Sequence, residues 1–359
     1  MSWEEYVRRV VPYTAGEQPS DPDIIKLNTN ECPYPPAPGV RAAMESLAKE
    51  ADRFRLYPDP DASVLADAIA AQYGLSEDEV FVGVGSDDVL ALSFLTFFGG
   101  GKELLFPDIT YSFYPVWADL FGIPYRQIPL TDSFEIDPAA YIPALSKKEN
   151  GGVIFPNPNA PTGLEASQDT VERIVRGNPD SVVIVDEAYI DFGGTTALPL
   201  IRKYDNLLVV QTFSKSRAMA GARIGFAMGD PKLIGYLKDV KFSFNSYTMN
   251  LPSLMAGKAA VEDRQYFDDI RQKVIDTRER FKRDLKQLGF VFPDSGANFV
   301  FAAHPDVPGP ELFAQLRARG ILVRHWDKPG ISEYLRITIG TDDQMKKVTE
   351  ALRDILGSR

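Results

Sequence analysis

The sequence contains only one cysteine, Cys32, and two histidines, His304 and His325, among 359 residues. A single cysteine excludes a disulfide bond within the chain and is typical of a reducing cytoplasm. Two histidines argue against a histidine-rich metal site, so we expect no metal. The longest apolar run, around residues 90–98, falls well short of the roughly 20 residues that span a bilayer. The first residues also lack the basic and apolar regions of a signal peptide. These absences predict a cytoplasmic protein without a membrane span.

The chain also lacks an excess of positive charge, since its net charge is −11 at pH 7. Such acidity argues against a general nucleic-acid-binding protein. It does not exclude a small anionic substrate, because a local cluster of arginines can outweigh the overall sign. Hydrophobic residues make up 44% and charged residues 25%, which is typical of a globular protein, and the length suggests two or three domains. We therefore expect an enzyme.

From about residue 62 the sequence alternates between segments typical of strands and of helices. The predicted strands lie at 79–84, 103–106, 152–155, 181–185 and 207–212. The predicted helices lie at 63–73, 87–98, 167–176 and 197–203. This alternation predicts an α/β fold with a mostly parallel, doubly wound sheet.

The pattern changes near the C-terminal third of the chain. A long amphipathic helix at 266–288 is followed by short strands at 299–303 and 335–339 and by two more helices, which predict a smaller α+β domain. The expected divisions are an N-terminal segment, a large domain and a small domain, at 1–35, 36–260 and 261–359.

In open α/β sheets, ligands bind at the carboxyl ends of the strands. The first predicted strand runs through Gly83-Val84-Gly85-Ser86-Asp87-Asp88 into a helix, whose free N–H groups and positive dipole end suit a phosphate. Alone, this pattern also fits a capped helix start without a ligand. Tyr111, after the second strand, either stacks on an aromatic ligand or is a partly buried core residue.

Two further strands end in loops of unusual composition. The loop at 156–163 contains three prolines and two asparagines, so it is rigid and its amides cannot all cap the turn, although an ordinary loop is the alternative. Asp186 directly follows a run of buried β-branched residues and needs a cationic partner in this low dielectric. A protonated pyridine nitrogen or an arginine in a structural ion pair would serve equally well.

The last of these strands, at 207–212, leads into Lys215. A lysine at this place would lie beside the Asp186 loop and could act as a nucleophile or base. Hydroxyl groups of Thr212 and Ser214, together with Arg223, would supply phosphate ligands. A solvated lysine is the usual case for an isolated residue of this kind. Five such loops at five strand ends, however, indicate one site.

At this point the motifs resemble a known family. The set G-V-G-S-D-D, P-N-x-x-P-T-G, D-E-A-Y, T-F-S-K and A-G-A-R-I-G resembles the class I/II aminotransferases of pyridoxal phosphate (PLP) fold type I. Four further passages resemble the histidinol-phosphate aminotransferases within that family, at 11–13, 27–31, 55–59 and 334–338. The resemblance implies PLP as cofactor, a large PLP-binding domain with a smaller C-terminal domain, and a homodimer.

The resemblance also implies a role for each cofactor-binding residue. Lys215 carries the cofactor as a Schiff base and moves the proton, Asp186 pairs with the pyridine nitrogen, and Tyr111 stacks on the ring. The residues expected to hold the phosphate are Ser86, Asp87, Thr212, Ser214 and Arg223, joined by Tyr57 from the neighbouring subunit.

One position departs from the family pattern. Tyr189 and an asparagine of the proline loop are expected to hydrogen-bond the phenolic oxygen of the cofactor. Many members have this asparagine directly before P-T-G, where this chain has Ala160. Asn159 or Asn157 would then supply the amide, and Asn159 is preferred.

For the substrate, the resemblance implies transamination of L-histidinol phosphate with 2-oxoglutarate to imidazole-acetol phosphate and glutamate. The pocket must accept a phosphate and, in turn, a carboxylate, and guanidinium groups bind both. The residues expected there are Arg324, Arg336, Tyr13 and Asn30. An aromatic amino-acid aminotransferase and a threonine-phosphate decarboxylase remain as alternatives, because related proteins share nearly all these motifs.

Overall fold

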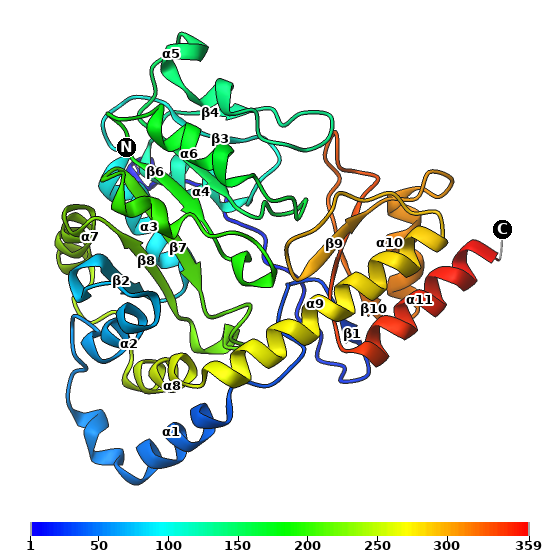
Figure 1. Ribbon diagram of the computed structural model, residues 1–359, viewed down its shortest axis with the longest axis horizontal. Coiled ribbons are helices and arrows are strands. Elements are labelled where there is room, and N and C mark those ends of the chain that lie inside the picture. Colours follow the sequence, from blue (N-terminus) through cyan, green and yellow to red (C-terminus); the bar gives the residue numbers. More distant parts are fainter. Residues whose placement is uncertain (1, 358–359) are drawn as a thin grey trace.

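A seven-stranded sheet forms the centre of the larger part of the molecule (Figure 1). The computed structural model describes residues 2–357. In spatial order the strands are β2 (Val80–Gly83), β8 (Gly225–Gly229), β7 (Leu207–Thr212), β6 (Val183–Asp186), β5 (Gly152–Pro156), β3 (Leu104–Pro107) and β4 (Tyr125–Ile128). β8 alone runs in the opposite direction to the other six strands. The predicted doubly wound, mostly parallel sheet is therefore confirmed.

Helices cover both faces of this sheet, which explains why its inner strands are apolar throughout rather than alternating. One face packs against α3 (Ser86–Phe97), α4 (Phe113–Phe121) and α7 (Pro231–Phe244). The other packs against α2 (Ser63–Tyr73), α6 (Gln168–Arg176) and α8 (Leu251–Glu262), and α1 (Pro38–Lys49) packs on the outside of α8. A short helix, α5 (Pro143–Ser146), lies outside these layers.

One predicted helix has a different form. The segment at 197–203 folds as a five-residue 3-10 helix, η6 (Leu198–Arg202), with a proline in its first turn. Segments this short favour i→i+3 hydrogen bonds over a full α-helix.

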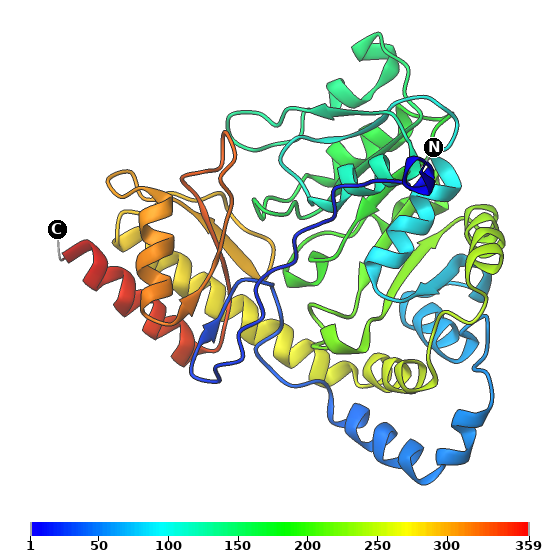
Figure 2. The same ribbon diagram turned by 180° about the vertical axis from the view of Figure 1, so that it is seen from behind.

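The smaller part combines two small sheets with three helices. Strands β9 (Phe299–Ala302), β12 (Leu335–Thr338) and β11 (Arg324–His325) form an antiparallel sheet. Near the N-terminus, β1 (Ile25–Lys26) pairs in parallel with β10 (Ile321–Leu322). The helices are α9 (Arg264–Gln287), α10 (Gly309–Ala318) and α11 (Asp342–Gly357). The N-terminal segment therefore crosses from the large sheet to the smaller part, as Figure 2 shows from behind.

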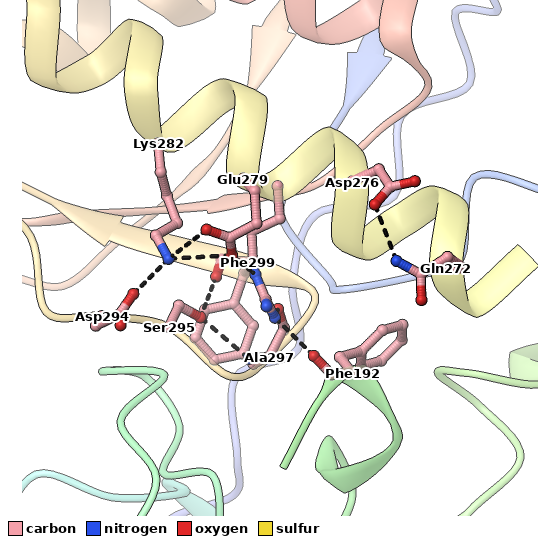
Figure 3. A network of polar contacts seen from close by, with 10 residues as sticks. Phe192, Gln272, Asp276, Glu279, Lys282, Asp294, Ser295, Ala297 and Phe299 are labelled. Carbon is pink, nitrogen blue, oxygen red and sulfur yellow. Dashed lines mark hydrogen bonds and ion pairs between the residues drawn. The ribbon is translucent and has the colours of Figure 1, made fainter.

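Helix α9 connects the two parts. Its buried Arg278 donates hydrogen bonds of 2.9 Å to the carbonyl oxygens of Phe192 in the large part and Ala297 in the small part. Further along the helix, Lys282 lies between Glu279 and Asp294 (Figure 3). These contacts fix the helix against both parts. Within residues 2–357, no helix is long and apolar enough to cross a membrane.

Candidate active site

The strand ends of the large sheet enclose a cavity of about 160 Å³. Its walls include nearly all of the predicted cofactor-binding residues, namely Ser86, Asp87, Tyr111, Asp186, Tyr189, Thr212, Ser214, Lys215 and Arg223. A second cavity of about 380 Å³ shares several of these residues and adds the predicted substrate-binding residues Tyr13, Asn30, Arg324 and Arg336. The two cavities together therefore form one candidate site.

Asp186 lies at the buried base of the first cavity. It is the last residue of β6, only 4% exposed, and accepts hydrogen bonds from the Tyr114 hydroxyl at 2.9 Å and the Ala188 N–H at 3.2 Å. Burial raises the pKa of the Asp186 carboxyl to about 6, although both hydrogen bonds act in the opposite direction. No arginine or lysine of residues 2–357 forms an ion pair with this carboxylate. Of the two cationic partners predicted for Asp186, an arginine in a structural ion pair is therefore absent from residues 2–357.

The opposite wall has a cradle at the start of α3. Strand β8 approaches this point so closely that a Cβ on Gly225 would lie 2.2 Å from the backbone nitrogen of Ser86. A Cβ on Gly85, which has φ +85°, would meet the Arg223 guanidinium at 2.5 Å. Arg223 also contacts the Asp87 carboxylate at 3.2 Å and the Ser214 hydroxyl at 3.5 Å. The free N–H groups of the helix start, a guanidinium and hydroxyls thus surround one place, which suits a phosphate.

Lys215 extends from the turn after β7 into the same cavity. Its amine donates a 3.1 Å hydrogen bond to the carbonyl oxygen of Thr29 and lies 5.9 Å from the centre of the Tyr189 ring. Tyr111 forms part of the cavity wall, and its hydroxyl donates to Asp87 at 2.8 Å. Burial and the Asp87 carboxylate raise the pKa of the Tyr111 hydroxyl well above its usual value, so this group stays a neutral donor.

The second cavity brings two arginines together around one tryptophan. The guanidinium carbons of Arg324 and Arg336 lie 5.5 and 5.1 Å from the centre of the Trp326 ring. Arg336 also lies over Phe299 at 5.3 Å and donates to the carbonyl oxygen of Asn28 at 2.9 Å, while its Nε has no partner. Desolvation lowers the pKa of Arg336. A half-buried guanidinium whose buried Nε–H has no partner is suited to an anionic ligand.

Two predicted residues lie elsewhere in the described chain. Both N–H groups of the Asn159 amide are occupied, by the Ile109 carbonyl oxygen and the Thr162 hydroxyl, each at 3.0 Å. Its side chain lines a separate cavity, while Ala160 lines the cofactor cavity. The structure thus does not support the preferred contact of Asn159 with a cofactor, because this amide has no donor left. Tyr57 is 81% exposed and stacks on Tyr247 instead of lining either cavity.

The sequence interpretation missed three residues of the site. Thr29 offers its carbonyl oxygen to Lys215, Tyr114 donates to Asp186, and Trp326 contacts both arginines. A backbone carbonyl leaves no mark on the sequence. Tyr114 and Trp326 are aromatic residues without a motif of their own, although Trp326 lies two residues after Arg324 and could have been found from that position.

A family model described as aminotransferase class I and II matches residues 22–352. The chain belongs to this family. Histidinol-phosphate aminotransferase 1 of Bordetella parapertussis is 53% identical over 356 residues, covering 99% of each chain. Histidinol-phosphate aminotransferase of Lactococcus lactis subsp. cremoris is 50% identical over 359 residues, or 100% of this chain and 99% of that one. The predicted membership is therefore confirmed.

The fold agrees with the same assignment. The structure of histidinol-phosphate aminotransferase from Sinorhizobium meliloti in complex with pyridoxal-5′-phosphate has a TM-score of 0.84 and 24% identity, covering 93% of this chain and 91% of that one. In the present chain, the buried Asp186 lacks a cation, which a protonated pyridine nitrogen would supply. The glycines at 225 and 85 let β8 and the Arg223 guanidinium lie directly against the start of α3, so that a guanidinium stands beside the N–H groups of this helix, as a phosphate requires. The residues present therefore fit pyridoxal phosphate.

Proposed function

We propose that this protein transfers the amino group of L-histidinol phosphate to 2-oxoglutarate, with pyridoxal 5′-phosphate as cofactor. The observation that carries the proposal is the pair Arg324 and Arg336 in the cavity that also contains Lys215. Histidinol phosphate has a phosphate and no carboxylate, whereas glutamate has two carboxylates. Guanidinium groups bind either anion, so one pocket serves both halves of the reaction.

The side chains divide the chemistry among them. When bound, the cofactor supplies an electron sink for the substrate carbon that loses its proton. Lys215 would hold the cofactor and then move the proton, since its amine reaches into both cavities. Asp186 would keep the pyridine nitrogen protonated, and the phosphate would lie against Ser86, Thr212, Ser214 and Arg223 together with the Asp87 N–H. Tyr111 would stack on the ring, and Tyr13 would line the substrate pocket.

An absorbance titration of the purified protein tests the substrate. We expect L-histidinol phosphate to remove the visible band of the bound cofactor and 2-oxoglutarate to restore it. O-Phosphothreonine and phenylalanine, run in parallel, represent the decarboxylase and the aromatic aminotransferase. If O-phosphothreonine alone changes the band and releases carbon dioxide, the proposed substrate and reaction class are wrong, although the role of Lys215 stands.

We also propose that the active unit is a cytoplasmic homodimer in which Tyr57 reaches the cofactor phosphate of the partner. The support is an exposed aromatic and aliphatic group beside Tyr57, which comprises Phe54, Leu56, Phe244 and Tyr247, at 54%, 60%, 75% and 45% exposure. Exposed apolar residues gathered at one place are typical of an interface.

Mixed dimers test this arrangement. If each site takes Lys215 from one subunit and Tyr57 from the other, a heterodimer of Lys215→Ala and Tyr57→Phe subunits has one site that lacks both residues and one that retains both. Co-expression of the two variants would therefore place one site with both native residues in each heterodimer. We expect this mixture to recover cofactor affinity that the Tyr57→Phe homodimer has lost by about tenfold, or about 1.4 kcal/mol. Unaltered affinity in the Tyr57→Phe homodimer would contradict the cross-subunit contact.

A further inference from the structure

Ala160 leaves the wall of the cofactor cavity without an amide. Ala160 lines the cavity at the position where the resemblance led us to expect an asparagine, and its neighbour Asn159 cannot substitute, because both N–H groups of that amide are already bound. The free Asn159 atom is the buried Oδ1, which has no partner and can only accept. Asn157, the other asparagine of the loop, lines neither cavity, and its amide bonds the backbone of Ala166. The loop therefore presents no side-chain N–H to the cofactor cavity.

Tyr189 offers the remaining donor near Lys215. Its hydroxyl oxygen accepts a hydrogen bond of 2.9 Å from the amide nitrogen of Asn30. Among the hydrogen bonds of residues 2–357, this hydroxyl donates its own proton to no acceptor. A phenol that accepts from an amide keeps its proton free for a third group. The ring, packed edge-on against Phe299 at 5.1 Å, cannot turn away without losing that contact.

Hydrogen bonds to Thr338 and Asn298 fix the orientation of Asn30. The Thr338 hydroxyl accepts from the Asn30 backbone N–H at 3.0 Å and donates to the Asn30 Oδ1 at 2.9 Å. The Asn30 carbonyl oxygen accepts from the Asn298 amide at 3.0 Å. Asn30 is 1% exposed. Because its Oδ1 is bound to a hydroxyl proton, the NH₂ end must face Tyr189.

The proposed cofactor places its phenolic oxygen at the Tyr189 hydroxyl, and we infer that Asn30 is the positioning residue that directs the Tyr189 proton to that oxygen, with no asparagine of the proline loop sharing the task. The inference rests on the proposed cofactor, and it changes the role of Asn30 from a substrate contact to a group that acts through Tyr189. The pair Thr338 and Asn30 then connects the small domain to the electronic state of the cofactor.

The inference has a spectroscopic consequence. With the cofactor held by Lys215, its negative phenolic oxygen would attract the proton on the lysine nitrogen. Each hydrogen bond donated to that oxygen weakens this attraction, so the pH-dependent change of the cofactor's visible spectrum moves to lower pH. With one donor instead of two, the midpoint of this change is high. Adding a donor lowers it, and removing Tyr189's proton raises it.

The test is a pH titration of the visible spectrum of the holoprotein without substrate. We expect Ala160→Asn to lower the midpoint by about one pH unit and Tyr189→Phe to raise it by about one unit. Asn30→Asp keeps the size of the side chain but replaces the donor with an acceptor that takes the Tyr189 proton, so it should shift the midpoint as Tyr189→Phe does. Asn159→Ala is the matched control from the neighbouring position and should leave the midpoint unchanged.

A double variant separates positioning from mere folding. If Asn30 acts through Tyr189, the midpoint of Asn30→Asp/Tyr189→Phe equals that of Tyr189→Phe alone. Additive shifts, a raised midpoint in Asn159→Ala, or an unchanged midpoint in Ala160→Asn would each overturn the inference. Thermal unfolding identifies any variant that fails to fold. If a variant at Tyr189 or Asn30 fails, Ala160→Asn still tests the inference, because it adds a donor and should lower the midpoint. Failure of the proposed substrate would leave this titration unaffected, since no substrate is present.

Discussion

The two halves of the active-site cavity are built in different ways. The cofactor half lies on the ends of neighbouring strands, where Asp186 pairs in register with Pro156 of β5 and Val210 of β7. The substrate half joins segments far apart in the chain, as when Arg336 of β12 donates to the Asn28 carbonyl oxygen. One half is thus fixed by a single sheet, and the other by contacts between the two parts of the molecule. Precise chemistry is placed on the rigid half, while the half that must accept two different anions depends on packing between segments.

The largest effect expected from this comparison is in the cofactor half. Replacing Lys215 by Ala removes both the attachment point and the group that moves the proton, so single-turnover rates with L-histidinol phosphate should fall by about 10³-fold or more. Borohydride reduction followed by mass spectrometry should detect a cofactor attached to the native chain and none attached to the variant.

One result with the Lys215→Ala variant would contradict the contrast between the two halves of the cavity. If the variant retains a cofactor that borohydride couples to another lysine, the sheet edge does not determine the attachment point. The control is Lys203→Ala on the surface, whose amine contacts the Glu172 carboxylate of α6, an oxygen that also accepts from the Tyr204 hydroxyl. It should leave both measurements unchanged.

The next effect concerns the substrate half. Arg336→Lys keeps the charge but loses the planar fork that packs between Phe299 and Trp326. We expect kcat/KM for L-histidinol phosphate to fall by about 10²- to 10³-fold. The visible spectrum of the substrate-free holoprotein should not change, because Arg336 lies outside the cofactor cavity.

Arg324→Lys is the matched comparison for Arg336. Its guanidinium lies 5.5 Å from the centre of the Trp326 ring. Its 3.4 Å contact to the Thr14 carbonyl oxygen is exposed, whereas the contact of Arg336 to Asn28 is partly buried. A smaller loss is expected, about tenfold, because solvent screens the interaction more strongly. An equal loss in both variants would show that burial does not separate the two arginines.

The same contrast explains how far the sequence could predict the molecule. Lys215, Asp186 and Arg223 follow apolar strand segments or turns that are recognisable in the sequence. Such local patterns are enough to predict which residues lie at the ends of the strands. β8 was harder to predict, because its residues read as the continuation of the A-G-A-R-I-G motif and its antiparallel pairing with β2 joins residues more than a hundred positions apart. The orientation of Asn159 could not be predicted for another reason, since the direction of a loop side chain depends on partners such as Ile109 that no local pattern reveals.

The substrate half shows the same limit more strongly. The sequence contains Arg324 and Arg336 plainly, but their common contact with Trp326 appears only once β11 and β12 are paired. The role of Asn30 depends in turn on Thr338, 308 positions along the chain. Such contacts arise from tertiary packing, which residue type alone does not encode.

The smallest effect is on stability and distinguishes Asp186 from its neighbour Glu187. Burial raises the pKa of Asp186 to about 6 and that of Glu187 to about 7, both above the unfolded values of about 3.9 and 4.3. The folded apoprotein therefore holds protons that the unfolded chain releases. The stability that these groups contribute is fully present below about pH 4 and is lost as the pH rises through 6 to 7. For Asp186 this amounts to at most about 3 kcal/mol.

Urea unfolding of apoprotein and holoprotein at pH 5 and pH 8, at one cofactor concentration, separates the two carboxyls. Asp186→Asn should flatten the pH dependence of the apoprotein. In the native holoprotein the cofactor's cation removes the same dependence, so the stabilisation by cofactor grows between pH 5 and pH 8. Glu187→Gln is the control, because Glu187 contacts Thr196, Ala197 and Gln211 rather than the cofactor cavity. Its effect should be the same with and without cofactor. If Asp186→Asn behaves like this control, the buried carboxylate stabilises the sheet edge alone and the cofactor's cation has another partner.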